Sequence, residues 1–275
     1  MLKSGLLYVA EDRGCEARVE AATKVSQAFG MHLTCVQAAP FPAYGISDIG
    51  GTFSYNGLLE QYEKKQAQTK EKVASILDNN NIDSRWFYTP GSASSAVVDY
   101  SRLSDLIILS HLEGDKGNWD QDLELISEIA VHARAPILSM PYEDPYGIGQ
   151  LKLDGGSIIV AWNGTFESAQ ALRFAVPVLS KASRVQIATI GLETVPFPAT
   201  EAQAYLTRHG VTSQVLSIAK EDREVEEQLL NVIIDEQADL AVLGAYGHSR
   251  MRERLLGGVT RFLLSRCPKP LLLAH

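Results

Sequence analysis

Short apolar runs alternate with amphipathic segments along the chain. In the second half, β-branched and other apolar residues fill the runs 157–162, 184–190, 239–244 and 270–274, which predicts buried strands. Residues 211–219 alternate between apolar and polar, as in a half-buried strand. Apolar residues recur at helical spacing between these runs, at 168–179, 199–209, 221–236 and 259–265. The first half follows the same order, and strands separated by helices predict an α/β fold with a parallel sheet covered on both faces.

The chain also contains an internal repeat. Asp105–Leu109 recurs as Asp239–Leu243, and Pro136 recurs as Pro270 at the same offset along the chain. Near the start of each half a larger offset fits better, and it relates Ala10 to Ala161. Two apolar runs and a proline kept in one register over such a distance indicate a duplicated unit.

Two tandem domains of doubly wound parallel sheet are therefore expected. We place them at residues 1–141 and 157–275, joined by a linker at 142–156 that is rich in turn residues. The two offsets differ by about 17 residues, so the first half carries an insert of about that length. The stretch Pro40–Asn56, rich in Gly, Pro and aromatic residues, is the expected insert. Because it follows the second strand, we expect it near the mouth of the first crevice.

Both halves keep their last strand, at 136–140 and at 270–274. An open edge strand invites pairing, and the matching strand of the other half is the nearest partner. We therefore expect the two halves to pack on each other about a pseudo-twofold axis. A homodimer and unidentified protein partners remain open.

Composition narrows the function classes. Lys and Arg total 25 against 33 Asp and Glu, a net charge of −8, which argues against nucleic-acid or membrane-surface binding because both need a basic field. Three cysteines, far apart and without metal spacing, predict reduced thiols. Glu11 and Asp12 interrupt the first apolar run too early for a signal peptide, and no apolar run approaches the ~18 residues of a membrane span. We expect a cytoplasmic protein.

A glycine-rich loop follows the strand at 239–244. Gly244 and Gly247 allow a tight turn and a close approach of the backbone to a ligand. Gly257 and Gly258 precede a helix whose free amides suit a phosphate. In an open α/β sheet, a loop at the carboxyl end of a strand borders the ligand crevice. The pattern Gly-x2-Gly-x9-Gly-Gly is neither a Walker loop nor the dinucleotide fingerprint.

With this loop the sequence resembles the universal stress protein family, whose nucleotide-binding members carry Gly-x2-Gly-x9-Gly-Ser/Thr after the fourth strand and an Asp at the end of the first. The resemblance implies Rossmann-like domains of the adenine-nucleotide alpha-hydrolase type in a stress-response protein that holds ATP (with Mg²⁺) or AMP as a regulatory ligand. The candidate nucleotide-binding residues then lie in the second half and are Ala161, Trp162, Asn163, Ile190, Gly244, Ala245, Gly247, His248, Gly257, Gly258, Val259 and Thr260.

Two positions depart from the family pattern. Gly258 stands where Ser or Thr would offer a hydroxyl to a phosphate, and Asn163 stands where the family has Asp. In the first half Asp12 keeps the acidic residue, but every motif glycine is replaced. By the offset that relates Pro136 to Pro270, their counterparts are Ser110, Glu113, Leu123 and Glu124. Because glutamates repel a phosphate, we expect the first half to have lost its phosphate site.

Three functions from different classes remain open. The first is a regulatory nucleotide-binding protein, the second an interaction scaffold whose two crevices hold no ligand, and the third a slow ATP hydrolase. Hydrolysis needs a general base and a metal anchor, and the sequence offers only His248 without a partner carboxylate. We therefore assign no catalytic residue and no metal ligands. Trp162 has two interpretations, stacking on a base or packing against its own helix.

Overall fold

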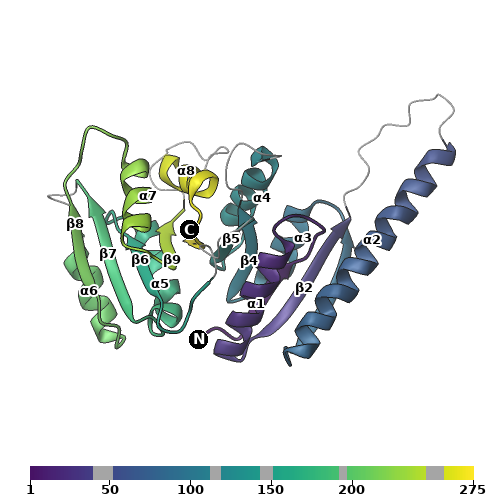
Figure 1. The fold of residues 1–275 in the computed structure, drawn as a ribbon, viewed down its shortest axis with the longest axis horizontal. Helices are drawn as coiled ribbons and strands as arrows, with labels where there is room; N and C mark the ends of the chain where they lie inside the picture. Colours follow the sequence, from purple (N-terminus) through teal and green to yellow (C-terminus); the bar gives the residue numbers. More distant parts are fainter. Residues whose placement is uncertain (40–51, 112–118, 143–150, 192–196, 246–256) are drawn as a thin grey trace.

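A single sheet runs through the molecule. The computed structural model describes residues 1–39, 52–111, 119–142, 151–191, 197–245 and 257–275. The strands in these parts of the chain form one ten-stranded sheet in the order β3-β2-β1-β4-β5-β10-β9-β6-β7-β8 (Figure 1). The second five strands repeat the order of the first five in mirror image. Each half is thus a doubly wound sheet, and the predicted α/β fold is confirmed.

The first half alternates strands and helices as its apolar pattern predicts. Its strands are β1 (Ser4–Tyr8), β2 (His32–Ala39), β3 (Ser84–Pro90), β4 (Leu106–His111) and β5 (Ile137–Pro141). Its helices are α1 (Cys15–Phe29), α2 (Thr52–Asn79), α3 (Ala93–Tyr100) and α4 (Trp119–His132), with a 3-10 turn at Ser101–Leu103.

The second half has the same order of elements. Its strands are β6 (Ser157–Ala161), β7 (Arg184–Ile190), β8 (Gln214–Ile218), β9 (Leu240–Gly244) and β10 (Leu271–Ala274). Its helices are α5 (Phe166–Leu179), α6 (Ala199–Arg208), α7 (Val225–Asp235) and α8 (Gly258–Arg266).

The strands β5 and β10 join the halves. They run antiparallel, whereas the strand pairs within each half are parallel. The paired residues are Ile137 with Leu273, Leu138 with Leu272, and Ser139 with Leu271. The prediction that the two last strands pair is therefore confirmed, and pairing leaves neither of them as an open edge.

Helices cover both faces of the sheet and enclose two apolar layers. One layer lies under α1, α2, α5 and α6, and the other lies under α3, α4, α7 and α8. Side chains alternate between the layers along each strand, so that Ile158 and Val160 of β6 face the first layer and Ile159 faces the second. Each fully buried aliphatic side chain contributes about 1.5–3 kcal/mol, and both faces of the sheet are filled in this way.

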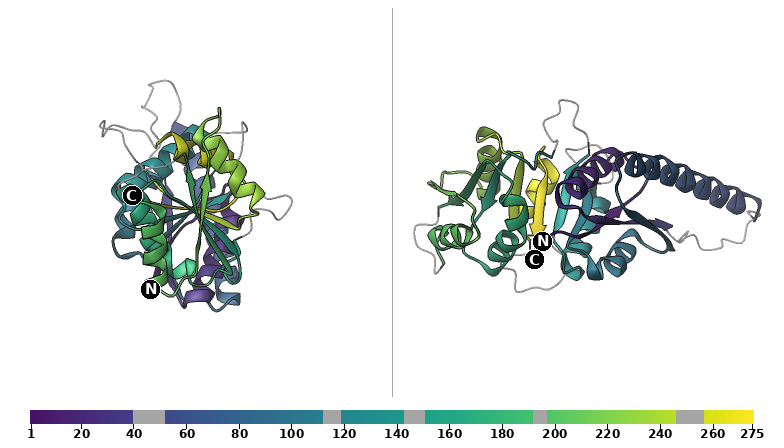
Figure 2. Two further views of the ribbon diagram at one scale, coloured as in Figure 1. Left: turned by 90° about the vertical axis from the view of Figure 1, so that its left-hand side faces the viewer. Right: turned by 90° about the horizontal axis from the view of Figure 1, so that it is seen from below.

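The extra length of the first half lies largely in a long helix. α2 has 28 residues, whereas its counterpart α6 has 10. It extends well beyond the sheet (Figures 1 and 2). The expected insert Pro40–Asn56 is therefore corrected, because residues 52–56 begin this helix and residues 40–51 lie outside the described residues. The Glu-, Gln- and Lys-rich sequence of α2 explains the difference, since these residues favour helix. Across the described ranges, no helix combines the length and the apolarity of a membrane span.

The structure describes the expected linker at Tyr142 and at residues 151–156. Residues 143–150 lie outside the described residues. Leu151 and Leu153 are buried in the apolar layer under α1 and α5. Lys24 of α1 donates a hydrogen bond to the carbonyl of Leu151 (3.3 Å). The end of the linker is therefore packed against the sheet.

Candidate functional site

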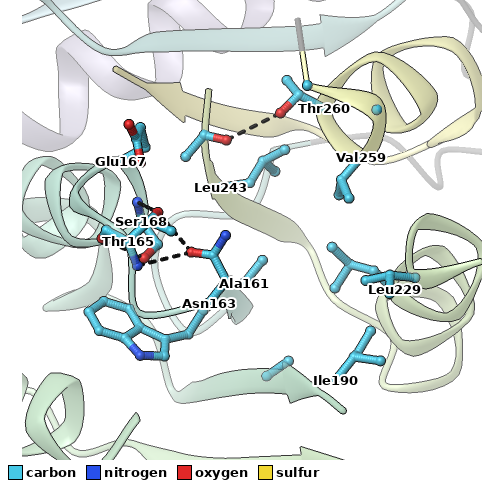
Figure 3. A pocket seen from close by; sticks show the side chains of 16 residues that line it. Ala161, Asn163, Thr165, Glu167, Ser168, Ile190, Leu229, Leu243, Val259 and Thr260 are labelled. Atoms are coloured by element: carbon cyan, nitrogen blue, oxygen red, sulfur yellow. Dashed lines mark hydrogen bonds between the residues drawn. The ribbon is translucent and has the colours of Figure 1, made fainter. Parts of the chain in front are cut away.

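A cavity of about 280 Å³ lies at the carboxyl ends of β6 and β9. β9 and β7 flank β6 on opposite sides, so this is the point where the strand order reverses and where open α/β sheets bind ligands. The cavity lies on the side of the sheet covered by α7 and α8 (Figure 3). Its lining residues are Ala161, Trp162, Asn163, Thr165, Glu167, Ser168, Ala188, Ile190, Val225, Leu229, Leu243, Gly244, Gly257, Gly258, Val259 and Thr260.

The structure brings together most of the candidate residues. Those that line the cavity are Ala161, Trp162, Asn163, Ile190, Gly244, Gly257, Gly258, Val259 and Thr260. Ala245 does not line it, because this residue is buried and its N–H donates to the carbonyl of Ala274 (2.7 Å). Gly247 and His248 lie outside the described residues.

The turn from β6 to α5 forms one wall. Gly164 adopts a left-handed φ of 75°, which glycine reaches without strain. Thr165 is the N-cap of α5, and its Oγ1 accepts from the N–H of Ser168 (3.4 Å). Asn163 Oδ1 accepts from both the N–H (3.2 Å) and the hydroxyl (2.8 Å) of Thr165, which closes an Asx turn.

These contacts decide the orientation of the Asn163 amide. A backbone N–H can only donate, so the atom that faces the N–H of Thr165 must be the side-chain oxygen. The Nδ2 group then lies on the opposite side of the amide and points into the cavity (Figure 3). Asn163 therefore offers hydrogen-bond donors to a ligand, where a carboxylate at this position would offer acceptors.

The first turn of α8 forms the opposite wall. Gly257 is the N-cap, no side chain caps the helix, and the first helical bond runs from the N–H of Arg261 to the carbonyl of Gly257 (3.0 Å). The amides that precede this bond belong to residues 258–260, which line the cavity. The hydroxyl of Thr260 turns back to the carbonyl of Gly244 (3.2 Å) and ties α8 to the end of β9.

Gly244 has a packing role that the loop motif did not predict. A Cβ at this position would lie 2.6 Å from the carbonyl carbon of Glu167 and 2.7 Å from the nitrogen of Ser168. The end of β9 therefore touches the backbone at the start of α5, and only glycine fits there. Gly258 differs, because the nearest atom to an added Cβ is Glu226 Oε1 at 3.9 Å.

Sequence reasoning missed several lining residues. Ala188, Val225, Leu229 and Leu243 add apolar surface beside Ile190, while Thr165, Glu167 and Ser168 add polar groups at the start of α5. A signal was present for two of them, because Val225 and Leu229 belong to the apolar stripe of the predicted helix 221–236. Nothing local in the sequence shows that this stripe ends at the crevice.

The model of the universal stress protein family matches residues 156–275. This part of the chain belongs to the universal stress protein family. The site described above therefore lies in a universal stress protein domain. A search of curated proteins found no match to the chain.

Solved universal stress proteins share the fold of the whole chain. A universal stress protein from Archaeoglobus fulgidus DSM 4304 superimposes with a TM-score of 0.73 at 13% identity, over 98% of this chain and 97% of that chain. A protein from Pseudomonas aeruginosa UCBPP-PA14, described as a putative universal stress protein, gives a TM-score of 0.63 at 14% identity, over 99% of this chain and 93% of that chain. At these identities the similarity is one of fold, and it includes both halves.

The structure decides between the two interpretations of Trp162 in the universal stress protein domain, which are stacking on a base and packing against its own helix. Its side chain belongs to the apolar layer under α5 and α6, on the other face of the sheet from Ile190 and Leu243. The indole N–H donates to the carbonyl of Phe197 (3.1 Å), and the two rings lie 6.2 Å apart. The indole is therefore a packing group, and stacking on a base in the cavity is not available to it.

The first half uses the equivalent positions for an internal network around Arg18. This side chain is 2% exposed, and its guanidinium contacts Asp12 Oδ2 (2.8 Å), the carbonyl of Tyr8 (3.0 Å) and Ser110 Oγ (3.1 Å). Burial acts against the Arg18 charge, but the Asp12 carboxylate outweighs it, so the pKa of the guanidinium is raised. Asp12 and Ser110 are the counterparts of Asn163 and Gly244, and both are bound to Arg18. Glu113 lies outside the described residues.

The described residues contain no arrangement suited to metal binding or to thiol chemistry. No set of three or more His, Cys, Asp or Glu side chains there is placed to hold a metal ion. Cys15, Cys35 and Cys267 form no disulfide, as expected. Burial raises the pKa of Cys35 to about 12, and burial also raises the pKa of Cys15. Neither thiol is activated as a nucleophile.

Proposed function

We propose that the chain binds one adenine nucleotide, ATP or AMP, in the cavity of its universal stress protein domain. The nucleotide acts as a regulatory ligand of a cytoplasmic stress-response protein. One observation carries the proposal: nine of the twelve candidate residues come from four separate segments and line one cavity. These segments are the end of β6, the end of β7, the end of β9 and the first turn of α8.

The chemistry of the walls supports an adenine nucleotide. Ile190, Ala188 and Leu229 provide apolar surface suited to the flat face of a base. Asn163 provides a donor suited to a sugar oxygen, and the uncapped start of α8 provides amides and a positive dipole end suited to a phosphate. The volume of about 280 Å³ is near the lower end of small-molecule sites, which run from about 300 to 1,000 Å³. A nucleoside fills such a volume, and the phosphates of a nucleotide then lie at the amides of the first turn of α8.

Charge at the cavity suggests a dependence on Mg²⁺ for ATP. Glu167 lines the cavity, and Glu226 lies near Gly258 at the start of α8. Carboxylates so placed repel a triphosphate more strongly than a monophosphate. We therefore expect Mg²⁺ to strengthen the binding of ATP and to have little effect on AMP.

Two measurements test the proposal. The first is mass spectrometry of the denatured extract of protein purified without added nucleotide, in which we expect an adenine compound. The second is calorimetric titration of AMP, and of ATP with and without Mg²⁺, in which we expect one tight site per chain.

A matched pair of variants locates the site. Ala161→Phe fills the cavity, and Ala10→Phe makes the same change at the counterpart position of the first half. We expect Ala161→Phe to weaken binding tenfold or more, a loss of about 1.4 kcal/mol, and Ala10→Phe to leave the affinity unchanged. Equal losses in the two variants, or two equivalent sites in the parent protein, contradict the proposal. Absence of heat with every adenine nucleotide supports the scaffold alternative, and release of phosphate from ATP supports the hydrolase alternative.

A further inference from the structure

A buried histidine connects the first half to the ligand-binding half. His111 is the last residue of β4 and is 1% exposed. Its Nε2 lies 3.0 Å from the carbonyl oxygen of Cys267, and its Nδ1 lies 3.0 Å from Ser139 Oγ. Ser139 and Cys267 are both fully buried. The imidazole therefore lies in the core at the junction of the two halves.

The partners decide which nitrogen carries the proton. A carbonyl oxygen can only accept, so Nε2–H donates to Cys267. The other nitrogen of a neutral imidazole is an acceptor, so the hydroxyl of Ser139 donates to Nδ1. Burial lowers the pKa of His111 to about 4, which keeps the ring neutral near pH 7. Both nitrogens are then satisfied without a charge.

Cys267 also ends the helix that borders the nucleotide cavity. It is the C-cap of α8, and residues 257–260 at the other end of α8 line the cavity. A helix of 9 residues is about 13 Å long, and its hydrogen bonds make it move as one rigid piece. α8 also packs against α4 of the first half. A contact that holds one end of α8 therefore influences where the other end lies.

We propose that His111 is a positioning residue for the nucleotide site. By holding the carbonyl of Cys267, it places the first turn of α8 at the distance from Asn163 that a bound nucleotide needs. The first half thus contributes to a site that lies wholly in the second half. This inference rests on the proposed function, because the positioned amides are those expected to bind phosphate.

The repeat supports a one-way arrangement. The counterpart of His111, at the offset that relates Ser110 to Gly244, is Ala245. Its methyl group has no donor, so the second half cannot hold α4 in the way that His111 holds α8. The histidine occurs in the half whose own motif glycines are replaced, and it reaches the half that keeps them. The clamp, by which we mean the hydrogen bond from His111 to the carbonyl of Cys267, therefore acts only on the half that contains the cavity.

Three variants separate positioning from general stability. His111→Ala removes the donor, and His111→Gln keeps a neutral amide N–H for the carbonyl of Cys267. His32→Ala is the control, because His32 is also hydrogen-bonded (Nδ1 to Asp83 Oδ2, 2.8 Å) but lies on the surface at the start of β2. The readouts are calorimetric titration of AMP at pH 7 and hydrogen–deuterium exchange of the α8 peptide without ligand.

We expect His111→Ala to weaken AMP binding roughly 2- to 30-fold, the range typical of mutations that couple sites through packed elements, and to speed exchange in α8. His111→Gln should recover most of both losses, and His32→Ala should change neither. A folded His111→Ala protein with parental affinity and parental exchange in α8 overturns the inference.

The parent protein provides a test that needs no variant. Coupling is reciprocal, so nucleotide binding should shift the ¹⁵N resonance of His111 Nε2 and slow the exchange of its proton. An unchanged resonance at saturating AMP overturns the inference. Failure of the proposed function is distinguishable, because AMP then produces no heat with the parent protein, whereas the exchange of α8 in His111→Ala still reports on the clamp.

Discussion

Leu138 of β5 and Leu272 of β10 lie opposite each other where the two halves meet. The repeat relates each of these residues to the other, at the same offset that relates Pro136 to Pro270. The neighbouring pairs are reciprocal, because Ile137 faces Leu273 and Ser139 faces Leu271. The two halves therefore meet as the subunits of a symmetric dimer do, with the same surface used on both sides.

The contact between Leu138 and Leu272 should contribute to the stability of the whole chain. Leu138 and Leu272 are 3% and 2% exposed, so Leu138→Ala and Leu272→Ala should each lower the free energy of unfolding by about 2–5 kcal/mol. Because the residues face each other, the double variant should deviate from additivity by at least about 0.5 kcal/mol. Urea unfolding of the four proteins measures both quantities. Strict additivity would show that the pair does not act as one contact.

Gly244→Ala should destabilise the protein by about 1–3 kcal/mol, because the added methyl group meets backbone atoms of α5 at 2.6–2.7 Å. Gly258→Ala is the matched control, since the nearest atom to its added Cβ is 3.9 Å away. The midpoints of thermal unfolding of the two variants measure the difference. Equal midpoints would refute the packing role of Gly244.

Gly258→Ser should strengthen the binding of phosphorylated nucleotides. The space at this position admits a side chain, and a hydroxyl at the start of α8 adds one hydrogen bond to a phosphate oxygen. Such a bond contributes about 0.5–1.5 kcal/mol, a gain of roughly 2- to 10-fold in affinity. Titration with AMP and with adenosine measures it. A gain that is equal for adenosine, or no gain at all, contradicts a phosphate at α8.

Asp12 and Asn163 occupy equivalent positions but should respond differently to substitution. Asp12→Ala leaves the buried Arg18 guanidinium without its carboxylate and should lower stability by about 1–3 kcal/mol, with unchanged nucleotide affinity. Asn163→Ala removes the donor in the cavity and should weaken AMP binding severalfold. Chemical denaturation and calorimetry of both variants test the contrast, which fails if Asp12→Ala also weakens binding.

The stability of the fold should fall as the pH falls from about 6.5 to about 4. Burial lowers the pKa of His111 to about 4 from its ordinary value of 6.5, so the unfolded state takes up this proton first. The contribution of His111 is constant above pH 6.5, and up to about 3 kcal/mol is lost over this range. Other groups titrate here too, so the measurement is the difference in unfolding free energy between the parent protein and His111→Gln. A difference that does not vary with pH contradicts this assignment.

Much of the fold could be predicted because its elements are set by local patterns. The strand 184–190 was expected with the bounds that β7 has, since its buried run is continuous and has turn residues at both ends. The long helix α2 shows the limit of this approach. Its sequence favours helix, but the neighbouring Gly, Pro and aromatic residues favour a loop and so predict the insert at 40–56.

The candidate site was predicted only as far as its motif reaches. Gly257, Gly258 and the end of β6 were found from spacing and resemblance. The side of the sheet on which Trp162 lies is set by the alternation of β6, and its hydrogen-bond partner lies 35 residues away. The packing role of Gly244 depends on how closely α5 crosses β9.

The repeat, the order of strands and helices, and the half of the chain that keeps the motif glycines can all be read from the amino-acid sequence. These follow from periodicity, spacing and residue type, which act between near neighbours in the chain. Three contacts appear only in the tertiary structure. Leu229 lines the cavity, Arg18 forms an ion pair with Asp12, and His111 donates a hydrogen bond to Cys267, which lies 156 residues further along the chain. Such contacts join segments that are distant in the sequence, and they form only when the sheet brings those segments together. The residue types determine which groups can interact, and the packing of the sheet and helices determines which of these groups meet.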